Sequence, residues 1–205
     1  MPVAARRHLA RTDPALGRLI ARIGPCRLKA QEGASPFRAL AEAIVYQQLT
    51  GKAASTILGR VLALFRPKRF PSPEDVLAVP EETLRGAGLS GGKVRALKDL
   101  SRRTLDGTVP PIARLRRMLD EEIVERLTQV HGIGVWTVQM LLIFRLGRPD
   151  VLPAGDYAVR KAFAKAFRTR GLPTPAQVLR RGERWRPHRS SASWYLWRSQ
   201  EASWP

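Results

Sequence analysis

Cysteine is almost absent from this 205-residue chain, since Cys26 is the only one. A single cysteine excludes an internal disulfide and the multi-cysteine sites that hold zinc or an iron–sulfur cluster. The three histidines, His8, His131 and His188, are far apart in the sequence and do not have metal-ligand spacing. We therefore expect no bound metal among side chains of these types.

Long apolar runs are also missing. No run approaches the roughly 18 residues that a membrane-spanning helix needs. The first residues include arginines but no apolar stretch after them, which is not the pattern of a secretory signal peptide. We expect a cytoplasmic protein without a membrane partner. With 44% hydrophobic residues, the chain is long enough to bury a core.

Acidic residues are scarce: the chain has 17 Asp and Glu but 36 Lys and Arg, which gives a net charge of +19. Such an excess attracts polyanions and raises the rate at which they are encountered. A GC-rich genome that encodes arginine often would contribute to the same bias. Charge alone therefore does not distinguish DNA, RNA and an anionic membrane as partners.

Strand signals are nearly absent, and helix starts are frequent. Four times a capping residue precedes a proline that suits the first helical position: Asp13-Pro14, Ser35-Pro36, Ser72-Pro73 and Thr174-Pro175. Apolar residues follow at helical spacing, so the chain is predicted to be all-α. Further helices are predicted over 157–167 and 190–202, and we expect the segment before Asp13 to be frayed.

A helix is also predicted after Gly91-Gly92. Its apolar residues Val94, Leu97 and Leu100 should face inward. Its basic residues are expected to face outward: Arg95, Lys98, Arg102 and Arg103.

The central stretch runs from Leu127 to Phe163. A short turn, His131-Gly132-Ile133-Gly134, separates two segments with apolar residues at helical spacing. Such a turn presents backbone N–H groups at the start of the second helix, where they suit a phosphate oxygen. Asp156 follows after a loop with two prolines. A phosphate-binding turn with a carboxylate behind it indicates chemistry on a nucleic acid.

This stretch resembles the helix-hairpin-helix, the Gly/Pro-rich loop and the Asp of the HhH-GPD DNA glycosylase superfamily. Within it, the chain is most similar to the bacterial 3-methyladenine DNA glycosylase II, or alkylbase glycosylase, group. The similarity extends to Ala43–Thr50, to Gly88-Leu89-Ser90 followed by Lys93, and to the segment from Trp185 through Trp197. It therefore covers most of the chain from Asp13 onward.

The resemblance implies a single HhH-GPD unit over 1–205, made of two helical lobes with a DNA-binding cleft between them. The approximate lobes are 36–130 and 13–25 plus 131–205. Several relatives carry a four-cysteine iron–sulfur cluster, which a chain with one cysteine cannot hold. The resemblance allows a monovalent cation at hairpin carbonyls and implies no other cofactor.

Asp156 is the predicted catalytic residue, at the position of the family's Asp. Breaking an N-glycosidic bond builds positive charge on the deoxyribose, which a fixed carboxylate stabilises while it orients the attacking water. The alternative is that Asp156 only caps the helix that begins at Tyr157. Both roles are compatible, because the start of a helix also stabilises negative charge.

Trp136 stands where bifunctional relatives carry the lysine that forms a Schiff base, so the resemblance implies a monofunctional enzyme. Trp136, Tyr157 and Trp197 match aromatic pocket positions, at which each contact with a cationic alkylpurine is worth about 0.5–2 kcal/mol. The alternative for these aromatic residues is core packing. Met140 replaces a common family aromatic, which leaves the substrate range open.

Gln48 matches the residue that wedges into the gap left by a flipped base. The alternatives are a polar residue that merely ends a helix, or Gln47 or Leu49 as the wedge. Two further contacts with DNA are expected. Phosphate should bind at Gly132, Gly134, Trp136 and Thr137, and the opposite strand should contact Ser90 and Lys93.

The resemblance therefore implies a metal-independent, monofunctional DNA glycosylase of base excision repair. It would excise alkylated purines, chiefly 3-methyladenine and also 7-methylguanine, after base flipping. Its expected partner is double-stranded DNA with damaged bases, in the bacterial nucleoid, and it would act as a monomer. Two alternatives stay open: a glycosylase for another damaged or mismatched base, and a non-catalytic helix-hairpin-helix module.

Overall fold

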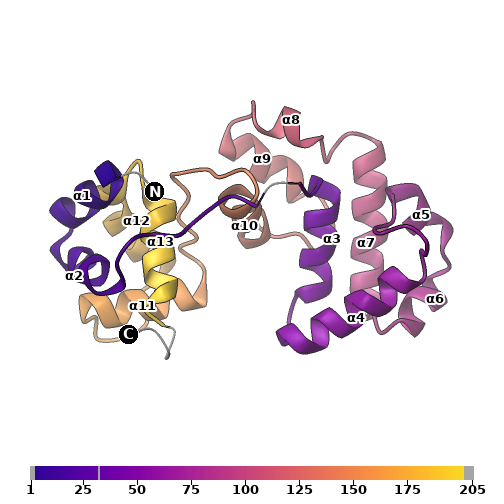
Figure 1. Ribbon diagram of the computed structural model, residues 1–205, viewed down its shortest axis with the longest axis horizontal. Coiled ribbons are helices and arrows are strands. Elements are labelled where there is room, and N and C mark those ends of the chain that lie inside the picture. The colour runs from indigo at the N-terminus through magenta and orange to yellow at the C-terminus, as the bar shows by residue number, and fades with distance from the viewer. Residues whose placement is uncertain (1–2, 32, 201–205) are drawn as a thin grey trace. The chain divides into compact units, whose positions relative to one another are not determined.

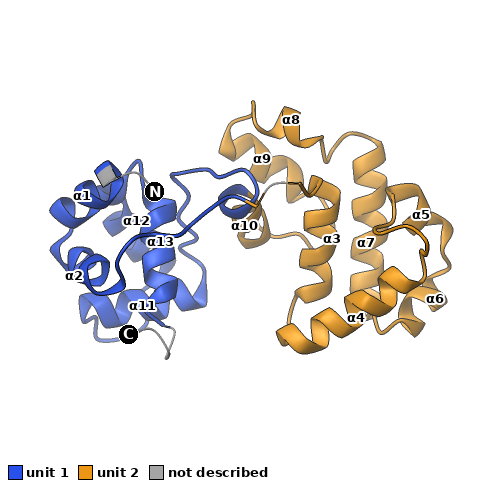
Figure 2. Cartoon of the chain, in the orientation of Figure 1, with its two compact units in different colours: residues 1–30, 142–205 blue, residues 31–141 orange. Residues whose placement is uncertain are grey.

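A computed structural model describes residues 3–31 and 33–200 (Figure 1). Every regular element in these residues is a helix, as predicted. None of these helices has the length and apolarity needed to cross a membrane. The chain forms two compact units, which we call the middle unit (31–141) and the terminal unit (1–30 with 142–205; Figure 2). The lobes were expected to divide near residue 130, whereas the units divide between Leu141 and Leu142.

The middle unit is built around one long helix, α7 (Gly91–Leu105). Helices α3, α5 and α6 all pack against α7, and α4 packs against α3. The other elements of the unit are α3 (Pro36–Tyr46), α4 (Gly51–Ala63), α5 (Pro73–Ala78), α6 (Glu81–Gly86), α8 (Ile112–Leu115) and α9 (Asp120–Leu127). Helix α10 (Val135–Phe144) begins in this unit and crosses its boundary.

Helix α7 buries Val94, Leu97 and Leu100, as its apolar spacing predicts. The prediction that Lys98 faces outward is wrong, because only 9% of this residue is exposed. Its Nζ donates to the carbonyl oxygens of Leu77 at 3.1 Å and Val79 at 2.7 Å, at the end of α5. The last carbonyls of a helix lack partners within it, so the ammonium and these acceptors satisfy each other.

The terminal unit is centred on α13 (Arg189–Arg198), which packs against α2 (Pro14–Ile23) and α11 (Tyr157–Phe167). Its other helices are α1 (Val3–Thr12), α12 (Pro175–Gly182) and the 3₁₀ helix η1 (Glu183–Trp185). Fully buried members of the core include Leu16, Val159, Ala162, Val178, Trp185, Ala192, Tyr195 and Leu196.

The expectation of a frayed segment before Asp13 is wrong for the described residues. Helix α1 begins at Val3 and packs against α2. Ala5 and Leu9 are buried, with 1% and 0% of their surface exposed. The tertiary contact stabilises a helix of ten residues that would be marginal on its own.

The predicted helix starts are confirmed, since each of the four capping side chains accepts a hydrogen bond from the first turn: Asp13, Ser35, Ser72 and Thr174. Asp156 caps α11, which has the predicted bounds. The last helix, predicted over 190–202, ends at Arg198, and the predicted end at Ala202 lies outside the described residues.

Asp13 also carries a buried ion pair in the terminal unit. Arg181 donates to both carboxylate oxygens, from Nε to Oδ2 at 2.7 Å and from Nη2 to Oδ1 at 2.9 Å. The indole N–H of Trp185 donates to Oδ2 at 3.1 Å. The guanidinium of Arg181 lies over the ring of Phe167 at 3.9 Å. The start of α2 is thereby joined to α12 and η1, which come much later in the chain.

Candidate functional site: a helix-hairpin-helix and a capped carboxylate

The hairpin turn between α9 and α10 requires glycine at position 132. Gly132 has φ = +78°, and a Cβ added there would lie 3.1 Å from the Cβ of Ala96 on α7. Both the left-handed backbone and the close approach disfavour any larger residue. Ile133 is buried beside it and anchors the turn in the core.

Two polar contacts from distant parts of the middle unit hold the turn. The carboxylate of Asp99 accepts from the His131 N–H at 2.8 Å. The Gln47 side chain donates from Nε2 to the Gly132 carbonyl at 2.9 Å. A carbonyl oxygen has two lone pairs, so this bond does not exclude the monovalent cation predicted at the hairpin, which stays a prediction.

Gln48 is presented on an exposed corner between α3 and α4. Its φ of +58° is unusual, because among the described non-glycine residues only Gln48 and Arg168 have a positive φ. The preceding residue Gln47 is fixed to the hairpin, and the Val45 carbonyl accepts from Lys93 Nζ at 2.7 Å. Backbone strain held in this way on an exposed corner is typical of functional sites.

Lys93 and Ser90 have structural roles in this unit. Burial lowers the pKa of the Lys93 ammonium, which binds the end of α3. The Ser90 hydroxyl caps α7 by accepting from the Lys93 N–H. Their predicted contact with the opposite DNA strand stays a prediction.

Lys93, Ala96 and Asp99 are three residues apart along α7. They contact the end of α3, Gly132 and His131 respectively. One helix therefore sets the position of the hairpin relative to the corner at Gln48.

The start of α10 has the geometry of an anion-binding helix end. The first bond within the helix runs from the Val138 N–H to the Gly134 carbonyl at 3.2 Å. The N–H groups of Val135 and Thr137 therefore have no acceptor within the helix. Thr137 is buried, with only 5% of its surface exposed. The Trp136 side chain is 48% exposed, whereas Met140 is partly buried.

The hairpin offers a matched pair of glycine substitutions. Gly132→Ala should lower the free energy of unfolding by about 1–3 kcal/mol, because it strains a left-handed residue and crowds Ala96. DNA affinity should fall with it. Gly134→Ala is the control, since a Cβ there meets nothing within 4 Å. Urea unfolding of both variants tests this, and equal stability would contradict the assigned geometry.

In the terminal unit, Asp156 is a well-oriented carboxylate at the start of α11. Its Oδ1 accepts from the Val159 N–H at 2.8 Å and from the indole N–H of Trp197 at 3.2 Å. Its own N–H donates to the Pro153 carbonyl at 2.9 Å. The helix cap is therefore real, and it leaves the catalytic role open. Tyr157, the next residue, is 66% exposed.

Trp197 links this carboxylate to an aromatic stack. Its ring stacks on Phe144, with centroids 5.8 Å apart and planes inclined by 28°. Phe144 was not among the predicted pocket residues. The sequence did contain a pattern that indicates it: Trp136, Met140 and Phe144 follow one another at intervals of four residues, which places them on one face of α10.

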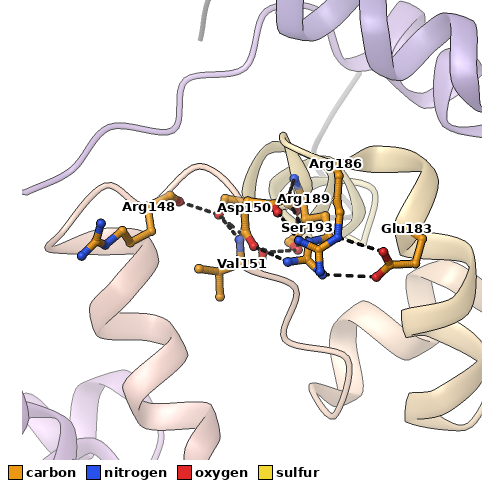
Figure 3. A network of polar contacts seen from close by, with 8 residues as sticks. Arg148, Asp150, Val151, Glu183, Arg186, Arg189 and Ser193 are labelled. Atoms are coloured by element: carbon orange, nitrogen blue, oxygen red, sulfur yellow. Dashed lines mark hydrogen bonds and ion pairs between the residues drawn. The ribbon is translucent and has the colours of Figure 1, made fainter. Parts of the chain in front are cut away.

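The loop before Asp156 is fastened to α13 by a polar network (Figure 3). The carboxylate of Asp150 accepts from Arg186 Nη1 at 2.8 Å and from Arg189 Nε at 2.9 Å. Arg189 also donates from Nη2 to the Asp150 carbonyl at 2.8 Å. The Ser190 hydroxyl donates to the Arg148 carbonyl at 2.6 Å and accepts from the Val151 N–H at 3.0 Å. This network fixes the loop that leads to Asp156.

The structure thus brings the predicted residues together in two groups. Gln48 and the hairpin lie in the middle unit, while Asp156, Tyr157 and Trp197 lie in the terminal unit. Among residues 3–31 and 33–200, no cluster of His, Cys, Asp or Glu could hold a metal ion.

Residues 41–187 match the model of the HhH-GPD superfamily of base excision DNA repair proteins, and the chain belongs to this family. It is similar to DNA-3-methyladenine glycosylase 1 of Schizosaccharomyces pombe, with 37% identity over 195 residues that cover 95% of this chain and 86% of the relative.

Solved structures agree with this assignment. The S. pombe 3-methyladenine DNA glycosylase Mag1 in complex with abasic DNA has a TM-score of 0.88 and 38% identity, over 98% of both chains. A DNA-3-methyladenine glycosidase from Bacillus halodurans has a TM-score of 0.84 and 31% identity, over 95% of this chain and 88% of that one.

Proposed function

We propose that this protein is a monofunctional DNA glycosylase that hydrolyses the N-glycosidic bond of alkylated purines, chiefly 3-methyladenine and also 7-methylguanine. The observation that carries the proposal is the carboxylate of Asp156, held by two donors at the start of α11. The similarity to 3-methyladenine glycosylases over nearly the whole chain supports the substrate class.

Asp156 is proposed to act on the sugar. As the glycosidic bond breaks, its electron pair leaves with the base and positive charge develops on the deoxyribose. The carboxylate stabilises that charge and orients the water that adds to C1′. A cationic alkylpurine becomes neutral as it departs, so it is a good leaving group without a general acid. Position 136 carries tryptophan and not lysine, so no Schiff base can form there. The product is therefore an abasic site in an unbroken strand.

Double-stranded DNA is the proposed partner of the middle unit. The backbone N–H groups at the start of α10 would hold a phosphate, which positions the duplex without reading its sequence. Gln48, on its exposed corner, would fill the gap left by the flipped base. Trp136 in this unit has an exposed ring that would offer an electron-rich face to a cationic base, and Tyr157 in the terminal unit has another.

A panel of duplexes tests the proposal. Each would carry one lesion: 3-methyladenine, 7-methylguanine, 8-oxoguanine, uracil or a mismatch. We expect release of the two methylated bases and strands that break only after alkali. Release of an oxidised, deaminated or mismatched base alone would contradict the substrate class. Tight binding without any release would identify a non-catalytic module.

A further inference from the structure

A cavity of about 540 Å³ lies in the terminal unit, between the end of α11 and α12. Four arginines line it, and no acidic side chain does: Arg170, Arg180, Arg181 and Arg184. We call it the arginine pocket. None of these residues belongs to the site described above.

The charge of the arginine pocket is largely uncompensated. Arg181 is neutralised by the buried carboxylate of Asp13. The guanidinium groups of Arg170, Arg180 and Arg184 are exposed and form no ion pair with any residue that the structure describes. Guanidinium groups present planar N–H donors that match phosphate oxygens, so three of them around one cavity favour an anionic ligand.

The walls of the pocket are held in place. Arg181 is fixed by two hydrogen bonds to Asp13 and lies over the Phe167 ring. The segment from Thr169 to Pro173 is held to α11 at both ends: the Thr169 N–H donates to the Ala164 carbonyl at 3.1 Å, and Arg160 Nε donates to the Pro173 carbonyl at 2.7 Å. A rigid wall reduces the entropy lost when an anion binds.

The arginines of the pocket are separated from Asp156 by the length of α11. Asp156 caps the first turn of this helix, Phe163 in its second half lines the pocket, and Arg170 follows its last turn. Eleven residues at 1.5 Å each span about 16 Å. A DNA strand advances about 3.4 Å per nucleotide, so the pocket cannot hold the nucleotide that reacts at Asp156.

We propose that the arginine pocket is a second phosphate-binding site, which takes backbone phosphates of DNA outside the stretch held by the hairpin and Asp156. The family acts on DNA and the chain carries a net charge of +19, which favours a phosphodiester over an acidic protein segment. Such a contact would strengthen binding to undamaged DNA without changing the chemical step.

The test is the triple variant R170Q/R180Q/R184Q in the full chain, which keeps Arg181 and its ion pair. Affinity for an undamaged duplex of about 30 base pairs is measured against salt, where each phosphate contact contributes about 0.9 to the log–log slope. We expect a slope shallower by about 2–3 and affinity about tenfold weaker at low salt. The rate of base release at saturating DNA should be unchanged.

A matched control removes the same charge elsewhere in the terminal unit. Arg11, Arg18 and Arg22 are exposed on α1 and α2, so R11Q/R18Q/R22Q should change the slope much less. Equal slopes for the two triple variants would overturn the proposal. So would unchanged DNA binding together with lost binding of polyglutamate, which would indicate an acidic protein ligand.

Two further measurements keep the test decisive. If the triple variant melts at a lower temperature than the wild type, R180Q and R184Q are measured singly, and each should reduce the slope by about 0.9. Binding of undamaged DNA needs no catalysis, so a failed base-release assay would leave this inference standing.

Discussion

Asp156→Asn is expected to lower the rate of base release by about 10²–10⁴-fold or more, because it removes the charge that stabilises the developing cation on the sugar. The amide oxygen of Asn can still accept from the Val159 N–H and the Trp197 indole, so the cap on α11 should persist. DNA affinity should stay within about twofold, since the phosphate contacts are unchanged. Single-turnover release of 3-methyladenine measures the first effect.

Asp150→Asn is the matched control for that substitution. Asp150 is a carboxylate in the same loop, but it pairs with Arg186 and Arg189 instead of facing a reaction. We expect lower stability, and a rate of base release that falls far less than in Asp156→Asn. If Asp156→Asn released base at the wild-type rate, the assignment of the catalytic residue would be wrong.

Asp13→Ala is expected to lower the free energy of unfolding by about 3–5 kcal/mol. The substitution removes the buried partner of Arg181 and Trp185 as well as the cap of α2. Urea unfolding measures the effect. Lys68→Ala is the control: it removes a surface ion pair with Asp75, and should cost at most about 1 kcal/mol. Similar losses for both variants would contradict the importance of the buried pair.

The same carboxylate predicts how stability depends on pH. Burial would raise the pKa of Asp13, but hydrogen bonds from Arg181 and Trp185 and the charge of Arg181 outweigh it, so the pKa is lowered from its usual value of 3.8. A carboxyl group whose pKa is lower in the folded state than in the unfolded state stabilises the fold at pH values above its unfolded-state pKa. This stabilisation is lost as the pH falls through the folded-state pKa. Below about pH 4, the wild type should therefore lose more stability on acidification than Asp13→Asn.

Local signals predicted most of the secondary structure. The four capping residues and the prolines after them begin helices, because a cap and the first turn involve neighbouring residues only. The errors arise where distant residues decide. Helix α1 exists because it packs on α2, and Lys98 is buried because the end of α5 supplies two carbonyls.

The site shows the same division. The resemblance to the family predicted Asp156, Gln48 and the hairpin glycines as site residues. It did not identify the contacts that hold them, because these join residues far apart in the chain: Gln47 reaches 85 residues to Gly132, Asp99 reaches 32 to His131, and Asp150 reaches 39 to Arg189. No local period encodes such pairs.

The central claim is that this chain removes an alkylated base and leaves the strand intact. The direct test is chromatography of free 3-methyladenine released from methylated duplex DNA without added metal, with the strand analysed before and after alkali. We expect free base from the wild type, at least about 10²-fold slower release from Asp156→Asn, and strand breakage only after alkali. Strand breakage without alkali, or no free base while DNA is bound, would contradict it.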